Sequence, residues 1–179
     1  MFSINACAMP EGALLNQYRN RSPSEDAEAY TDCFSVDIDG AVVLSEFVFS
    51  FYTTPVFKLE RAILKHLAAK PSSDYEAKQL SDGSIDAFAA WTVEQRTEEQ
   101  LLMRDYRGRT RSWFMVSPIV ATGQPKTLLF FGSAVVPVEN RKTGKLEIGS
   151  GFSLLLGFHK LYSKILLYSA KLRLAKMRT

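Results

Sequence analysis

A long proline-free segment, 152–177, places the strongest constraint on the fold. Its leucine, isoleucine and aromatic residues recur at intervals of three and four, which is the spacing of one face of an α-helix. Basic residues near its end suit a helix C-terminus, where the backbone dipole favours positive charge. We therefore expect one long amphipathic helix that closes a core. Its predicted apolar stripe consists of Leu154, Phe158, Leu161, Ile165, Tyr168 and Leu172, widened by Leu155, Tyr162 and Leu166.

The segments before this helix show the two-residue alternation of β-strands. In the first, Phe34, Val36 and Ile38 lie on one side, as expected for a strand with one buried face. Short connections separate the later segments, and such connections join antiparallel neighbours. Strands are predicted at 30–37, 87–94, 100–106, 110–121 and 127–138.

Two helices are expected after the first strand, at 42–52 and 56–69, with a further short helical turn at 74–80. Pro55 suits the first turn of the second helix, and Thr54 is a candidate cap. The apolar face of that helix is predicted to consist of Val56, Leu59, Ile63 and Leu67.

This order of elements predicts an α+β fold, in which a curved antiparallel sheet packs on the long C-terminal helix. A strongly curved sheet leaves room for a ligand cavity beneath such a helix. Residues 30–179 are expected to form this single domain, and residues 1–29 an N-terminal extension.

Composition and motifs argue against several function classes. A formal net charge of +3 is too small to indicate a nucleic-acid partner. Cys7 and Cys33 have no CxxC spacing and the two histidines form no metal motif, so no metal or other cofactor is expected. The cysteine usage favours a reduced, cytoplasmic setting. The sequence contains no phosphate-loop motif, no recognisable leader in 1–10 and no apolar run long enough to span a bilayer.

Four short motifs carry a resemblance: YTDCF at 30–34, TTPVF at 53–57, RGRTRSW at 107–113 and GFHKLY at 157–162. With them the chain resembles a bacterial family, the one numbered 2867 among domains of unknown function. More distantly, the order of elements is similar to the START-like helix-grip superfamily, which includes polyketide cyclases and lipid carriers. This resemblance implies a cavity for an apolar ligand, but no particular reaction, because one fold hosts many functions.

An arginine-rich hairpin, 104–111, is the most unusual local feature of the sequence. Its arginines lie close together across the predicted turn, and such a group can hold a carboxylate or phosphate through paired hydrogen bonds. Trp113 follows on the same face as Arg109 and Arg111, so this face of the strand is expected to run from the arginines towards a cavity. The alternative is a solvated hairpin whose charges are balanced by Asp105, with Trp113 in the core.

His159 lies beside the apolar stripe of the final helix, near Tyr162, and is a candidate acid or base if it faces a pocket. The alternative is a histidine on the helix surface. His66 lies in a different predicted helix, so the spacing gives no support to metal or nucleophilic catalysis.

Three functions remain open, and no catalytic residue is assigned. The first is binding of a small apolar or amphipathic molecule between the sheet and the final helix, and the second is a metal-free enzyme of cyclase or hydratase type. The third is a protein-interaction or membrane-surface module, which is less favoured. It is suggested by Leu156, Leu167 and Leu174, which lie off the apolar stripe of a basic helix. The alternative is that these leucines pack against neighbouring strands or a second subunit. The candidate ligand-binding residues are Arg104, Arg109, Arg111, Trp113, His159 and Tyr162.

Overall fold

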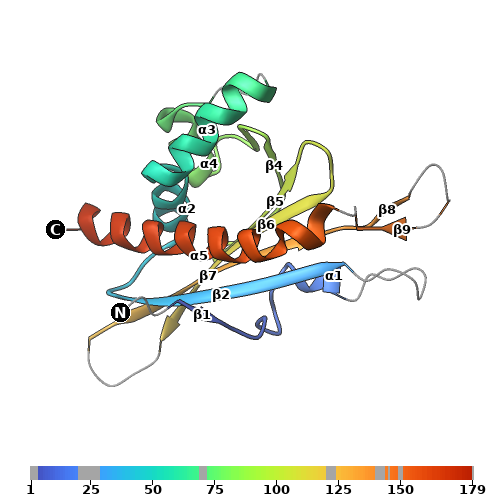
Figure 1. Cartoon of the computed structure of the whole chain (residues 1–179). Coiled ribbons are helices and arrows are strands. Elements are labelled where there is room, and N and C mark those ends of the chain that lie inside the picture. The colour runs from blue at the N-terminus through green and yellow to red at the C-terminus, as the bar shows by residue number, and fades with distance from the viewer. Residues whose placement is uncertain are drawn as a thin grey trace.

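The computed structural model describes residues 4–19, 29–68, 72–119, 124–139, 144, 146–148 and 151–178. These residues form an α+β fold, in which a curved seven-stranded antiparallel sheet carries a long C-terminal helix across one face (Figure 1). The predicted fold class is therefore confirmed. Within the described ranges, no helix is both long enough and apolar enough to cross a lipid bilayer.

The sheet has the strand order β1-β2-β7-β6-β5-β4-β3. Strands β2 and β6 each pair with β7 along their whole length, so β7 lies between them. The predicted strand 87–94 is divided in two, because Ala89 and Ala90 form a turn. The strands are β1 Asn5–Ala6, β2 Tyr30–Asp39, β3 Ala87–Phe88, β4 Trp91–Arg96, β5 Gln100–Asp105, β6 Thr110–Ile119 and β7 Lys126–Val135, with a separate pair β8 Val138–Glu139 and β9 Leu146–Glu147.

Helices α2 (Leu44–Tyr52), α3 (Pro55–Ala68) and α4 (Asp74–Asp82) gather at one end of the sheet, and α5 (Gly151–Met177) runs along the sheet (Figure 1). The backbone N–H of Phe57 donates to Thr54 Oγ1 at 3.1 Å, as the predicted cap requires. Ser73 and Glu76 form a capping box at the start of the following helix. The helices are α1 Asn16–Arg19, α2 Leu44–Tyr52, α3 Pro55–Ala68, α4 Asp74–Asp82 and α5 Gly151–Met177.

Helix α5 packs with a different face from the predicted one. Phe158 is 66% exposed and Leu161 is 57% exposed, although both belong to the predicted stripe. The stripe prediction was wrong for these two residues, whereas Leu166 is buried as predicted, and Leu154 and Leu155 lie outside the described side chains. Leucines occur all around this helix, so contacts with α2 and β2 select the buried face. The buried residues on α5 are Ser163, Leu166, Leu167, Ala170 and Leu174.

Two hydrophobic clusters cover the two faces of the sheet. The larger one lies between the sheet and the helices and includes Phe47 and Phe114. The smaller one lies on the opposite face, where Leu15 packs in the same cluster as Trp113. Residues 4–19, expected as part of an extension, thus contribute a strand and a cover to the fold.

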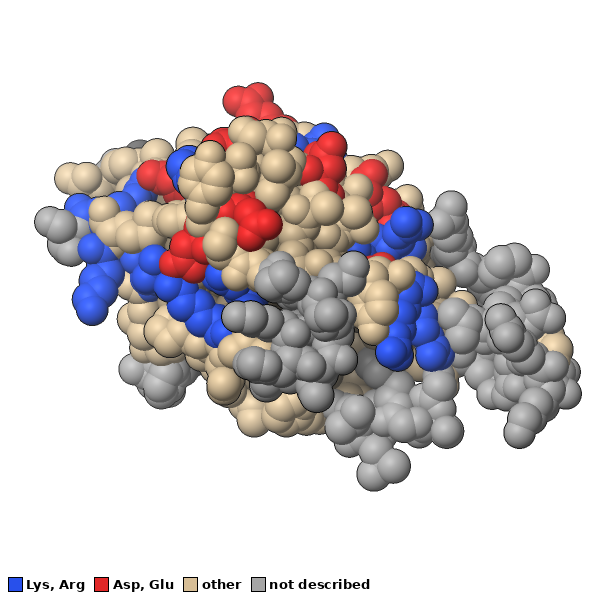
Figure 2. All heavy atoms as spheres, turned by 90° about the horizontal axis from the view of Figure 1, so that it is seen from above, with Lys and Arg blue, Asp and Glu red and all other residues tan. Residues whose placement is uncertain are grey.

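Charged side chains of both signs share the face that is seen from above (Figure 2). Acidic side chains lie across its middle, and basic ones lie towards its left and right ends. Mixed signs are ordinary for a solvated surface, and they agree with the small net charge of +3.

Candidate functional site

A cavity of about 200 Å³ lies between the sheet and helices α2, α3 and α5. Strands β4, β6 and β7 form its sheet side. A dry cavity of about 150 Å³ is large enough to bind benzene. This cavity therefore has room for a molecule of about one ring with small substituents.

Aromatic rings form most of the apolar wall: Phe51 and Tyr52 from α2, Phe57 from α3, Trp91 from β4 and Phe131 from β7. The rings of Phe51 and Phe131 lie 4.7 Å apart between centroids, and those of Tyr52 and Phe57 are also 4.7 Å apart. Rings packed against their neighbours in this way lose little freedom on ligand binding. The wall is thus already formed without a ligand.

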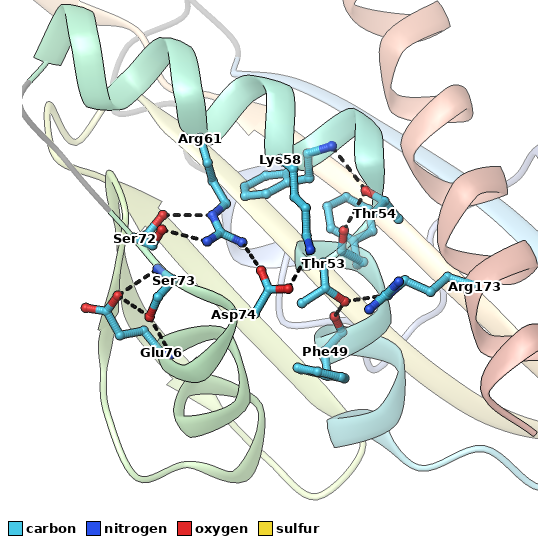
Figure 3. Close-up of polar contacts among 12 residues, drawn as sticks. Phe49, Thr53, Thr54, Lys58, Arg61, Ser72, Ser73, Asp74, Glu76 and Arg173 are labelled. Atoms are coloured by element: carbon cyan, nitrogen blue, oxygen red, sulfur yellow. Dashed lines mark hydrogen bonds and ion pairs between the residues drawn. The ribbon is translucent and has the colours of Figure 1, made fainter.

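A polar cluster holds α3 in place against its neighbours (Figure 3). The guanidinium of Arg61 contacts the Asp74 carboxylate on α4 at 2.7 Å, and Lys58 contacts the same carboxylate at 2.5 Å. Arg173 on α5 donates to the hydroxyl of Thr53 at 2.6 Å. These contacts fix the side of α3 that lines the cavity.

Glu60 on α3 brings a carboxylate to the cavity wall, and the hydroxyl of Tyr162 on α5 donates a hydrogen bond to it. Burial raises the pKa of Glu60, although the hydrogen bond from Tyr162 opposes this effect. Burial and the neighbouring Glu60 raise the pKa of Tyr162, which therefore stays protonated at neutral pH. The pair joins α3 to α5 across the cavity.

Tyr52 adds a second phenol to the wall. Its side chain is only 1% exposed, and its hydroxyl has no hydrogen-bond partner within the described part of the chain. A buried hydroxyl without a partner costs about 1–3 kcal/mol relative to a satisfied one. The cavity thus contains a polar group whose hydrogen bonds a ligand would complete.

A third polar group lies where α5 meets the sheet. The Ser133 hydroxyl on β7 lies 2.6 Å from Asp32 Oδ1 and 2.7 Å from His159 Nε2. The same Nε2 is 3.5 Å from Asp32 Oδ2, which also accepts a hydrogen bond from Tyr30 at 2.9 Å. Ser133 and His159 line the cavity, with Asp32 behind them.

The hydrogen bonds of this group fix where its protons lie. Burial alone would raise the pKa of Asp32, but hydrogen bonds with His159 and Ser133 lower it. The carboxyl is therefore ionised at neutral pH. Ser133 must then donate its one proton to Asp32, and His159 Nε2 carries a proton towards Ser133. Ser133 is therefore not activated as a nucleophile, whereas His159 is a candidate proton donor.

Three of the candidate residues predicted from the sequence, Arg111, His159 and Tyr162, line this cavity. Trp113 does not, because it is fully buried on the opposite face of the sheet, where its Nε1 donates to Gln100 Oε1 at 2.9 Å. The cavity instead contains Trp91.

In the β5–β6 hairpin Arg104 lies directly opposite Arg111, but the guanidinium of Arg111 is already engaged. The guanidinium of Arg111 lies over the Tyr18 ring, at 4.7 Å from its centroid, and 2.7 Å from Glu94. Arg104 is exposed on β5, and the backbone N–H of Arg109 donates to Asp105 in the turn. The Asp105 carboxylate therefore stabilises the turn.

Sequence reasoning missed Asp32, Ser133, Glu60 and Tyr52. Asp32 did carry a signal, because it alternates in phase with Phe34 and so places a charge on the apolar side of its strand. Glu60 was hidden by the predicted stripe of α3, in which Leu59 is in fact 65% exposed.

Comparison with known proteins adds no relative to this geometry. The family numbered 2867 and the START-like superfamily therefore remain predictions from the motifs and the order of elements. No protein-family model matches the chain, and no curated protein matches it.

Proposed function

We propose that this protein binds a small amphipathic molecule, about the size of one ring, between the sheet and α5. The observation that carries the proposal is the hydroxyl of Tyr52, which is buried in a wall of aromatic rings and has no hydrogen-bond partner among the described residues. Apolar cavities with a few convergent polar groups are the usual form of small-molecule sites. Here Tyr52, Glu60 and His159 are such groups.

Filling the cavity tests this proposal. Ser112 lies on β6 and lines the cavity, so Ser112→Phe places a ring where the ligand would bind. Ser117→Phe is a matched control, because Ser117 is a partly buried serine on the same strand whose side chain alternates to the other face.

Binding is measured by ligand-observed NMR with a set of single-ring compounds. We expect the wild-type protein and Ser117→Phe to bind the same members, and Ser112→Phe to lose at least about tenfold in affinity. Equal binding by Ser112→Phe would show that the compounds bind outside this cavity. No binding by the wild-type protein would reject the proposal.

A second candidate function is proton-transfer catalysis, as in a cyclase or hydratase. It is favoured by one observation: the imidazole of His159 and the Glu60 carboxyl line one cavity. A general acid and a general base at one site are the elements that such chemistry requires. Exchange of carbon-bound ligand hydrogens in D₂O tests it; exchange that disappears in His159→Gln supports catalysis, and its absence from the wild-type protein leaves binding alone.

A further inference from the structure

The carboxyl group of Glu60 is unusual because it is partly buried with no balancing cation among the described side chains. Within the described ranges its hydrogen-bond partner is the Tyr162 phenol, and no lysine or arginine forms an ion pair with it. Buried carboxylates are normally paired with a positive charge, because an isolated charge is costly to remove from water. The cavity therefore has a position beside Glu60 for a cation that the described side chains do not fill.

The walls around Glu60 are those that attract organic cations. Tyr52, Phe57, Trp91 and Tyr162 line the same cavity as the carboxyl. Faces of tyrosine and tryptophan rings attract ammonium groups, most strongly where water is excluded. Aromatic rings around one acidic group are the usual means of recognising an alkylated ammonium.

The charges around the cavity disfavour the opposite choice, an anionic ligand. Besides Glu60, the Asp32 carboxylate lies behind His159 and Ser133. Arg111 lines the cavity, but its guanidinium is already engaged by Glu94 and Tyr18, whereas an anion there would meet the carboxyl of Glu60.

We infer that the ligand class of this cavity is a small organic cation, an amine or a quaternary ammonium, whose charge lies against Glu60 and the surrounding rings. This inference rests on the proposed binding function and makes it more specific. The phenol of Tyr52 then accepts a hydrogen bond from an amine or donates one to a hydroxyl elsewhere on the ligand.

The test uses pairs of compounds that differ in charge and not in shape. Tetramethylammonium, choline and benzyltrimethylammonium are each compared with the carbon analogue in which a tert-butyl group replaces the trimethylammonium. Calorimetric titration of the full chain measures each affinity. We expect each cation that binds to do so at least about tenfold more tightly than its neutral partner.

Two variants identify the groups responsible. Glu60→Gln keeps the size and the hydrogen bond to Tyr162 but removes the charge, so we expect it to abolish the preference for cations. Trp91→Leu replaces a partly exposed ring, and we expect it to weaken binding of the cation more than that of the neutral partner. Thermal unfolding of both variants verifies that they are folded.

The outcomes separate the two proposals. Neutral partners that bind as tightly as the cations would overturn the inference and leave the proposed binding function standing. A preference for cations that survives in Glu60→Gln would also overturn it, because the charge would then be recognised elsewhere. If neither charged nor neutral compounds bind, the proposed function fails and the inference fails with it.

Discussion

The phenol of Tyr162 on α5 donates a hydrogen bond to the carboxyl group of Glu60 on α3, between residues 102 positions apart in the sequence. The contact closes the helix side of the cavity. It also leaves the carboxyl in a place where burial, and not ion pairing, decides its protonation. The free energy of unfolding should therefore depend on the pH through this residue.

We predict that Glu60→Gln is more stable than the wild-type protein at neutral pH, by on the order of 1 kcal/mol, because it removes a buried charge. The folded-state pKa of Glu60 is raised, so the native state binds more protons than the unfolded state between the two pKa values. Wild-type stability thus falls as pH rises through this window. The advantage of Glu60→Gln should grow over the same window and be small below about pH 4.

Urea unfolding at several pH values measures this difference. Glu98→Gln is the control, because Glu98 is exposed, and it should change the free energy of unfolding by less than about 0.5 kcal/mol. A Glu60→Gln variant that is less stable than wild type at every pH would show that the charged form is favoured in the native state.

The sequence predicted the longer strands β2, β5, β6 and β7 and the extent of α5, because alternation and the lack of proline are local properties. The short strands β1, β8 and β9 were not predicted. The sequence also did not predict which face of α5 is buried. Apolar residues occur around the whole helix, so Leu161 and Leu167 are equivalent in sequence, although the first is exposed and the second is buried. Only the position of β2 and α2 distinguishes them.

The two tryptophans provide a test of which face of the sheet carries the cavity. Trp113 is fully buried beneath the N-terminal residues, whereas Trp91 is partly exposed and lines the cavity. We predict that acrylamide quenches Trp91 several-fold more efficiently than Trp113, because the quencher requires contact with the indole. Trp113→Phe isolates the first signal and Trp91→Phe isolates the second.

A cavity ligand should likewise change the fluorescence of Trp113→Phe and leave that of Trp91→Phe nearly unchanged. Equal quenching of the two variants, or a ligand response confined to Trp113, would contradict this assignment of faces. Alternation alone does not decide the question, since Trp113 and Phe114 place a large apolar side chain on each face of β6.

The partners of His159 show why the rest of the site was not predicted. Asp32 and Ser133 reach His159 from β2 and β7, and the bonds between them join distant parts of the chain. Neither residue has a local spacing that marks a site. Their proximity follows from the β2–β7 register, in which Asp32 is directly opposite Ser133.

We predict that Asp32→Asn lowers the free energy of unfolding by about 2 kcal/mol at neutral pH, because hydrogen bonds to a charged acceptor are lost. The pKa of Asp32 is lowered by folding, so its stabilising effect is present above the unfolded pKa and is lost as pH falls through the folded pKa. The difference between the variant and wild type should therefore shrink in acid, below about pH 4.

Asp39→Asn is the matched control for this change. Asp39 is on the same strand, but its side chain is 84% exposed and contacts Lys126 at the surface. Surface pairs of this kind contribute about 0–1 kcal/mol. If Asp32→Asn cost no more than Asp39→Asn, the Asp32–Ser133–His159 group would have no stabilising role in the fold.

Oxidation of the cysteine pair tests how the N-terminal residues are attached. Cys7 continues the antiparallel register of β1 on β2, its N–H donates to the carbonyl of Cys33 at 3.0 Å, and the two sulfur atoms lie 3.0 Å apart. We predict that diamide converts the pair to an intramolecular disulfide. The two thiols lose two electrons and two protons, which diamide takes up as it becomes the hydrazine.

Cys7 should react first, because Cys33 is buried and burial raises the pKa of its thiol. The Cys33 sulfur then displaces the adduct from Cys7.

A crosslink between positions 26 apart should stabilise the fold by about 3 kcal/mol through the loss of freedom in the unfolded chain. The intact mass should fall by two hydrogen atoms, the urea midpoint should rise, and a reductant should reverse both changes. Cys7→Ser should show neither change. Oxidation that yields only dimers would mean that residues 4–19 do not lie against β2 in solution.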